Sequence, residues 1–176
     1  SKQLLKEDRR VFTHIDRFFA SLYDLDRLDC EVIRDTLSVV PPYKAVRLRA
    51  SRPPRAAEAD RFRNRVESLL SPFFRAVGTE PRVSLLPANQ TDDAPIPAYR
   101  ILLISRRSRS KFTIDPALWR QITNLATESG ATRITYTADN GFVVALLNQY
   151  RFWTPSRARL LAATLAREEH LTGKAC

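Results

Sequence analysis

Cysteine, histidine and glycine are scarce in this chain, and each shortage excludes a class of protein. The two cysteines, Cys30 and Cys176, lie far apart, and with only two histidines they form no spacing suited to a zinc site or a disulfide framework. The four glycines are scattered, so the chain has no Gly-x4-Gly-Lys-Ser/Thr loop for binding phosphate. The low cysteine content, and an N-terminus that leads into a charged amphipathic segment without a signal peptide, predict a cytoplasmic protein.

Long apolar runs and recognisable catalytic sets are absent as well. No stretch reaches the roughly 18 apolar residues that a membrane-spanning helix needs. The sequence Val-Pro-Pro-Tyr at 40–43 differs in one residue from the Asn/Asp-Pro-Pro-Tyr motif of enzymes that methylate DNA amino groups, but valine cannot accept a hydrogen bond from the target amine. His14 and His170 fall in no recognisable pattern with a serine or a cysteine. We therefore expect no intrinsic catalysis, no cofactor and no metal site.

Lysine is rare too, and arginine carries nearly all of the positive charge. The chain has 29 basic and 19 acidic residues, a formal net charge of +10, and all but five of the basic residues are arginines. Arginine binds phosphate bidentately and stacks on aromatic rings, which lysine does poorly. The composition therefore favours a nucleic-acid partner, although an acidic protein partner or a GC-rich genome would also account for it.

Hydrophobic periodicity predicts a helical N-terminal arm over residues 1–43. Apolar side chains recur at helical spacing over 4–23, in a stripe that is rich in phenylalanine. A second helix is expected over about 26–39, because apolar residues again repeat at helical spacing and an aspartate stands where an N-cap is needed. The two helices are expected to form a hairpin, which two prolines then end.

Residues 56–176 are expected to form one α+β domain. Asp115-Pro116 and Thr154-Pro155 each pair a good N-cap with a proline in the first helical turn, where the missing N–H costs nothing. The sequence Asp-Asn-Gly at 139–141 is typical of a hairpin turn with positive φ at both central positions. The expected elements are helices at 56–74, 116–129 and 155–170 and strands at 82–86, 99–105, 132–137 and 142–147. The predicted fold class is α+β, an N-terminal helical hairpin followed by a four-stranded, mainly antiparallel sheet packed with helices.

Three arginine-rich segments are candidates for contacting nucleic acid. The densest, at 106–111, follows an apolar strand that would hold it along a phosphate backbone. The second is the basic connector at 44–55, whose alternation of basic and apolar residues allows a short edge strand. The third is the strand-to-helix junction at 149–159, where arginines accompany rings that can stack on bases. The candidate nucleic-acid-binding residues are Arg106, Arg107, Arg109, Lys111, Arg47, Arg49, Arg151, Trp153, Arg157 and Arg159.

Each segment also has an interpretation without a ligand. Runs of charge are commonly no more than solvated surface, which applies to both 106–111 and the connector. Phe152 and Trp153 would equally serve as core side chains at the start of the last helix, with Arg151 outside. Close to Arg157, the N-terminal amides of that helix favour an anion in either case.

Two stretches resemble one protein family. The sequence at 18–37, FFASLYDLDRLDCEVIRDTL, is similar to a stretch of the form aromatic, Leu-Tyr-Gly-Leu, Asp/Glu, Val-Ile-x-Asp-Thr-Leu. That stretch follows the catalytic region in large bacterial N6-adenine DNA methyltransferases of restriction-modification and phage-defence type; Asp24 here replaces its usual glycine. The sequence at 149–159, QYRFWTPSRAR, resembles the Gln-x-Arg-Tyr-Trp-Thr-x-x-Arg-Ala-Arg stretch near the C-terminus of the same proteins.

The resemblance implies a C-terminal, non-catalytic portion of such a protein, or a separate subunit of such a system. The predicted function is therefore a module of a bacterial defence system that binds duplex DNA or docks a methyltransferase to other subunits. The alternative is a protein-interaction adaptor that makes no contact with DNA and docks through the aromatic residues Phe12, Phe18 and Phe19 of its N-terminal helix. A nuclease with an unrecognised site is the third interpretation.

Overall fold

The computed structural model describes residues 14–40, 44–86, 98–106 and 114–172. A helical segment at 14–22 precedes the labelled elements. These elements are, in chain order, α2 (Arg27–Val39), α3 (Lys44–Ser51), α4 (Ala56–Ala76), β1 (Arg82–Leu85), β2 (Tyr99–Ser105), α5 (Pro116–Glu128), β3 (Arg133–Ala138), β4 (Gly141–Leu147), η2 (Tyr150–Phe152) and α6 (Pro155–Thr172). None of the described helices combines the length and the hydropathy that crossing a bilayer requires.

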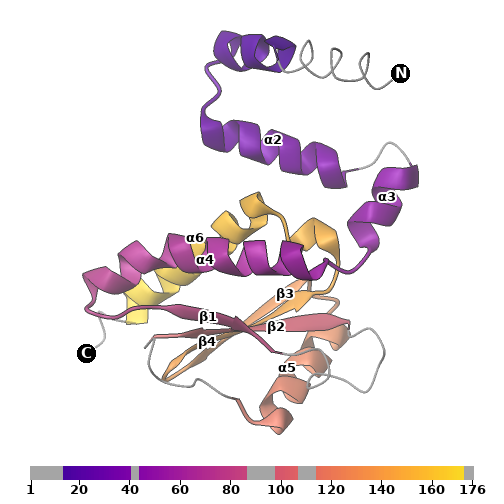
Figure 1. The fold of residues 1–176 in the computed structure, drawn as a ribbon. Helices are drawn as coiled ribbons and strands as arrows, with labels where there is room; N and C mark the ends of the chain where they lie inside the picture. The colour runs from indigo at the N-terminus through magenta and orange to yellow at the C-terminus, as the bar shows by residue number, and fades with distance from the viewer. Residues whose placement is uncertain (1–13, 41–43, 87–97, 107–113, 173–176) are drawn as a thin grey trace.

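Within the described residues, the strands form a four-stranded sheet in the order β1-β2-β4-β3, and every neighbouring pair is antiparallel. Helices α4 and α6 cover one face of the sheet and α5 covers the other (Figure 1). The central strands β2 and β4 are apolar almost throughout because both of their faces are buried. The α+β class, with a helical N-terminal region, is therefore confirmed.

The core has two layers that the sheet separates. The larger layer joins α4 and α6 to the sheet, and its largest members are Phe62, Phe74, Phe142, Trp153 and Leu165. The smaller layer lies under α5 and is built from alternate residues of the central strands, such as Ile101 and Val143, together with Ile122 and Ala126. Alternation within each strand thus sends successive side chains to opposite layers.

Helix α5 begins and ends as the sequence predicts. The Asp115 side chain accepts a hydrogen bond from the Ala117 amide, and Pro116 occupies the first turn. At the other end, the hydroxyl of Tyr99 donates toward the carbonyl oxygens of Ala126 and Ala131, at 3.0 and 2.8 Å. The hydroxyl therefore ties the C-terminal end of the helix to strand β2, and burial raises the pKa of Tyr99.

The hairpin between β3 and β4 differs from the prediction in its turn geometry. Ala138 pairs with Gly141, so Asp139 and Asn140 form a two-residue turn. Both of these residues keep negative φ, and the positive φ falls on Gly141, at 150°. The predicted turn with positive φ at both central positions is therefore wrong, because Gly141 belongs to the strand rather than to the turn.

The basic connector contains a helix, α3, and the short edge strand considered for it is wrong. Val46 is half-buried and Ala50 is buried, so the protected side chains lie four residues apart, as on a helix face. The hydroxyl of Ser51 donates to the carbonyl oxygen of Arg47 one turn earlier. The apparent alternation spans too few residues to distinguish a strand from a helix.

The described part of the N-terminal arm, residues 14–40, consists of two helices joined by a tight turn. Asp24 lies in this turn with φ of 50°, a conformation that glycine adopts most easily, and among the described residues no other non-glycine residue has positive φ. Asp26 then caps α2 through bonds from the amides of Leu28 and Asp29. Helix α2 reaches the domain where the amide of Ser156 donates to the Asp35 carboxylate at 2.7 Å.

Candidate nucleic-acid interface

Helix α3 and the short helix η2 form one continuous surface, although about one hundred residues of sequence separate them. The amide of Tyr150 donates to the carbonyl oxygen of Arg52 at 2.8 Å, which joins the end of α3 to η2. The guanidinium groups of Arg49 and Arg52 lie over the Tyr150 ring, 5.4 and 4.7 Å from its centroid. This aromatic ring therefore organises the arginines of α3 through cation–π contacts.

Arg52 has a structural role in this arrangement. Its guanidinium binds the Glu58 carboxylate bidentately, with distances of 2.7 and 2.8 Å, and also donates to the carbonyl oxygen of Pro53. Glu58 in turn accepts a hydrogen bond from the Arg55 amide at the start of α4. The hydrogen bonds from Arg52, with smaller contributions from the Arg55 amide and the nearby charges, lower the pKa of Glu58 from 4.5 to about 2. The ion pair thus fixes α3 against the first turn of α4.

Three other arginines on this surface are exposed. Arg47 and Arg49 lie on α3, and Arg151 lies on η2 with its guanidinium 5.1 Å from the centroid of the Phe152 ring. Among the described residues, none of the ion pairs involves these three side chains. We call the surface formed by Arg47, Arg49, Tyr150 and Arg151 the α3–η2 face; in it Arg49 lies over Tyr150, and Arg47, two positions earlier, projects from another side of α3. The segment from 44 to 55 adds no acidic residue to it.

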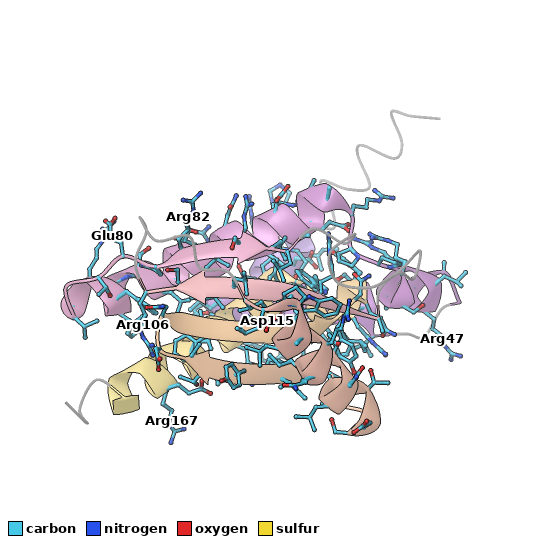
Figure 2. All side chains as sticks on the ribbon, turned by 90° about the horizontal axis from the view of Figure 1, so that it is seen from below. Arg47, Glu80, Arg82, Arg106, Asp115 and Arg167 are labelled. Carbon is cyan, nitrogen blue, oxygen red and sulfur yellow. The ribbon has the colours of Figure 1, made fainter. Side chains whose placement is uncertain are left out.

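Arg106 lies at the opposite end of the sheet from α3. Its guanidinium donates to the carbonyl oxygens of Ala138 and Asp139, at 2.8 and 2.7 Å, and lies over the Phe142 ring. Figure 2 shows Arg106 and Arg47 at the two ends of the molecule. Strand β2 alone separates these ends by roughly 20 Å, from the usual rise per residue. The predicted residues Arg107, Arg109 and Lys111 lie outside the described residues.

Trp153, which was predicted to contact nucleic acid, is a core residue. Only 2% of its surface is exposed, its ring lies 5.0 Å from that of Phe62, and its indole N–H donates to the carbonyl oxygen of Leu147. Because both the ring and the N–H are engaged inside the domain, Trp153 cannot stack on a base. Phe152 is half-buried and packs against the same core.

The two predicted residues of α6, Arg157 and Arg159, lie in different surroundings. Arg157 is exposed and lines a cleft beside the sheet. Arg159 is half-buried toward α2, where its charge helps to lower the pKa of Asp26, although the hydrogen bond from the Asp29 amide contributes most. The anion expected at the N-terminus of α6 is present within the chain itself, since the Asp35 carboxylate binds the Ser156 amide. The sequence could not show this contact, because the two residues are 121 positions apart.

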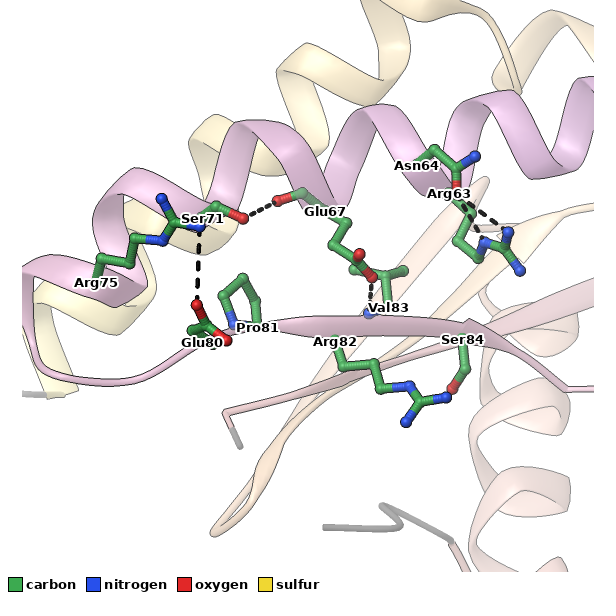
Figure 3. Close-up of a pocket in the computed structure, with 10 residues that line it drawn as sticks. All are labelled: Arg63, Asn64, Glu67, Ser71, Arg75, Glu80, Pro81, Arg82, Val83 and Ser84. Atoms are coloured by element: carbon green, nitrogen blue, oxygen red, sulfur yellow. Dashed lines mark hydrogen bonds and ion pairs between the residues drawn. The ribbon is translucent and has the colours of Figure 1, made fainter. Parts of the chain in front are cut away.

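A polar groove of about 510 Å³ between α4 and strand β1 was not predicted from the sequence. Figure 3 shows its lining, in which the Glu67 carboxylate accepts a 2.7 Å hydrogen bond from the Val83 amide and Arg75 pairs with Glu80 at 3.7 Å. The groove presents both signs of charge, so its electrostatics favour neither an anion nor a cation. In the part of the chain that the structure describes, no three histidine, cysteine, aspartate or glutamate side chains come close enough to hold a metal ion.

Comparisons with protein-family models, with curated proteins and with solved structures found no match to this chain.

Proposed function

We propose that this protein is a non-catalytic module that binds duplex DNA through its α3–η2 face. The observation that carries the proposal is the group of exposed arginines around Tyr150, which no acidic residue among the described residues neutralises. The net charge of +10 would add long-range attraction for a polyanion. We propose a cytoplasmic location for this activity, which the low cysteine content favours.

The geometry suits contacts with the phosphate backbone. The Arg52–Glu58 ion pair and the Tyr150 ring fix the backbone of α3, from which Arg47 and Arg49 project, and the contact with Tyr150 would reduce the side-chain entropy that Arg49 loses when it binds phosphate. Arg151 would add a third contact from the adjoining η2. Contacts to phosphate fix the position of a protein on DNA and carry no sequence information directly. We therefore propose binding to the DNA backbone by this face, without a preferred base sequence.

The resemblance to bacterial N6-adenine DNA methyltransferases supports the same biological setting. Asp24 stands where that family has glycine, and its positive φ is a reason for glycine to be common at this position. The second similar stretch contains Tyr150 and Arg151 of the α3–η2 face. We propose that the module serves a restriction-modification or phage-defence system, in which it would engage DNA beside a catalytic subunit or region.

Salt-dependent binding tests the proposal directly. Fluorescence anisotropy of a labelled duplex would compare wild type with an Arg47/Arg49/Arg151→Ala variant at roughly 50 and 200 mM salt. We expect tight, salt-steep binding by the wild-type protein. In the variant the slope of log affinity against log salt should become shallower by about 0.9 for each lost phosphate contact.

An Arg61/Arg75/Arg82→Ala variant is the matched control, because it removes the same charge from exposed positions on α4 and β1. Equal weakening by both variants would mean that net charge alone drives binding and would contradict the assignment to the α3–η2 face. Loss of binding only in an Arg107/Arg109/Lys111→Ala variant would move the interface to the predicted 106–111 segment. Absence of wild-type binding at low salt would overturn the proposed function.

A second candidate function rests on the exposed aromatic surface of the arm. Phe18, Leu22 and Tyr23 are more than 60% exposed, and Phe19 stacks on Tyr23 with ring centroids 6.4 Å apart. Large apolar patches of this kind commonly mark protein interfaces. Under this alternative the protein is an adaptor that makes no contact with DNA, and a Phe18/Leu22→Ser variant would abolish capture of the partner subunit. Phe12, also assigned to this interface, lies outside the described residues.

A further inference from the structure

We propose that the open edge of strand β3, together with the cleft beside it, binds an extended acidic segment of a partner polypeptide as an added strand. This site adjoins the α3–η2 face at Phe152, but it uses other polar groups and does not depend on DNA binding.

Strand β3 lies at one edge of the sheet, and among the described strands it pairs with β4 alone. The amide of Leu147 donates to the carbonyl oxygen of Thr132, which makes these two residues a hydrogen-bonded pair. In an antiparallel ladder such pairs alternate, so the backbone groups of Arg133, Thr135 and Thr137 point away from β4. Within the described residues, no hydrogen bond reaches these outward groups. A further strand could therefore pair with them.

The opposite edge of the sheet is protected. Strand β1 has only four residues, and the Glu67 side chain from α4 accepts the outward hydrogen bond of the Val83 amide at 2.7 Å. A carboxylate in this position competes with the carbonyl oxygen of any incoming strand. The six-residue β3, with its β-branched and aromatic residues, has no comparable cover among the described residues. The two edges therefore differ in their capacity to accept a strand.

A cleft of about 290 Å³ lies next to the open edge and suits side chains from an added strand. Its apolar lining comes from Leu146, Phe152, Leu160 and Leu161, and Leu160 is 55% exposed. Phe62, Thr132, Arg133 and Arg157 complete the lining, and no described carboxylate pairs with either arginine. In strand addition the backbone provides affinity, and pockets for alternate side chains provide specificity. Here the two arginines select carboxylates at those alternate positions.

Charge also decides which kind of partner fits. A second copy of this chain could pair through its own β3, but each copy carries a net charge of +10, and both would bring Arg133 and Arg157 to the contact. A nucleic acid offers acceptors in its phosphates, but it cannot provide the alternating N–H and C=O groups that continue a sheet. An extended acidic polypeptide satisfies both the backbone and the arginines.

The test uses a fluorescein-labelled peptide of alternating valine and glutamate, as long as β3, titrated with the whole protein. We expect saturable binding that weakens at least tenfold when lysine replaces glutamate, or when N-methylation of the central residues, valine and glutamate alike, removes their backbone N–H groups. Hydrogen exchange should show new protection at the amides of Arg133, Thr135 and Thr137. An Arg133/Arg157→Glu variant should lose binding, whereas Arg75/Arg82→Glu, with the same change of charge beside β1, should retain it.

The proposal is overturned if the valine–glutamate peptide does not bind, or if the N-methylated peptide binds equally well. It is also overturned if protection appears at α3 instead of β3, because the peptide would then act as a simple polyanion. Self-association of the free protein with protection of the same three amides would assign the edge to a second copy and contradict the acidic partner.

Discussion

At Gly141 the neighbouring strand leaves no room for a side chain. Its φ is 150°, and a Cβ built there would collide with the carbonyl oxygen of Ile104 on the neighbouring strand. We expect Gly141→Ala to lower the free energy of unfolding by about 3 kcal/mol or more, since backbone strain and a steric clash combine. Urea denaturation followed by circular dichroism measures this change.

Gly78 and Gly130 provide matched controls for this substitution. Both have positive φ, at 75° and 62°, but a Cβ at either position would meet no atom within 4 Å. Alanine there should cost only about 1 kcal/mol, from the left-handed conformation alone. If all three substitutions lowered the free energy of unfolding equally, the close approach of β2 to Gly141 would have no energetic consequence.

The roles of single residues were predicted well only where their partners lie nearby in the sequence. Asp115 caps α5 as expected because both the cap and its amide partner belong to one turn. Trp153 was given both a nucleic-acid and a core interpretation, and it packs in the core; Arg106, a candidate for binding phosphate, donates to carbonyl oxygens at the β3–β4 turn. Their partners are set by the folding of distant strands, which residue type and local spacing do not specify.

At the scale of elements, the Arg52–Glu58 pair holds α3 against α4 and should respond to pH. The pKa of Glu58 is lowered from 4.5 to about 2, so the pair stabilises the fold fully above pH 4.5, and this stabilisation is lost as the pH falls toward 2. A Glu58→Gln variant should be less stable than wild type at pH 7, by about 1 kcal/mol, and this difference should vanish near pH 2. Denaturation in urea at several pH values measures both quantities.

Glu80→Gln is the corresponding control, because Glu80 and Arg75 form an exposed pair at 3.7 Å. Exposed pairs contribute little to stability, so this variant should follow wild type at every pH. If the stability of the Glu58→Gln variant fell between pH 4.5 and 2 as steeply as that of wild type, other carboxylates would account for the loss of stability in this range.

The sequence predicted the boundaries of most elements to within a few residues, and α3 shows where periodicity fails. Long helices such as α4 bury five positions at helical spacing, which gives a strong signal. Helix α3 has eight residues, and among those whose burial is described Ala50 alone is buried, so its pattern is weak in either period. Its conformation depends on contacts with η2 and with Glu58, and these form only once the domain is folded.

Over the whole molecule, the arm and the α+β domain differ in how many of their residues are buried. None of the residues of α2 is buried, and its polar contacts with the domain include Asp35 with the Ser156 amide and Glu31 with Arg65 at 3.4 Å. We expect the amides of α2 to exchange with solvent through local opening, with protection at least about tenfold lower than in α4. Hydrogen exchange followed by mass spectrometry resolves the two helices.

Asp35→Asn removes the negative charge that accepts a hydrogen bond from the Ser156 amide at the start of α6. Protection from hydrogen exchange should therefore fall further in α2 and stay unchanged in α4. Equal protection of α2 and α4 in the wild-type protein would show instead that the arm and the domain open as one cooperative unit. The same experiment with an added partner would report whether the exposed aromatic residues at 18–23 become covered.

Each face of the sheet carries one of the chain's two tryptophans. Trp153 is buried in the layer of α4 and α6, and Trp119 is buried on α5 across the sheet. The protein therefore contains one intrinsic fluorophore in the layer of α4 and α6 and another on α5, so variants retaining a single tryptophan can distinguish stepwise from concerted melting of these parts without an added dye.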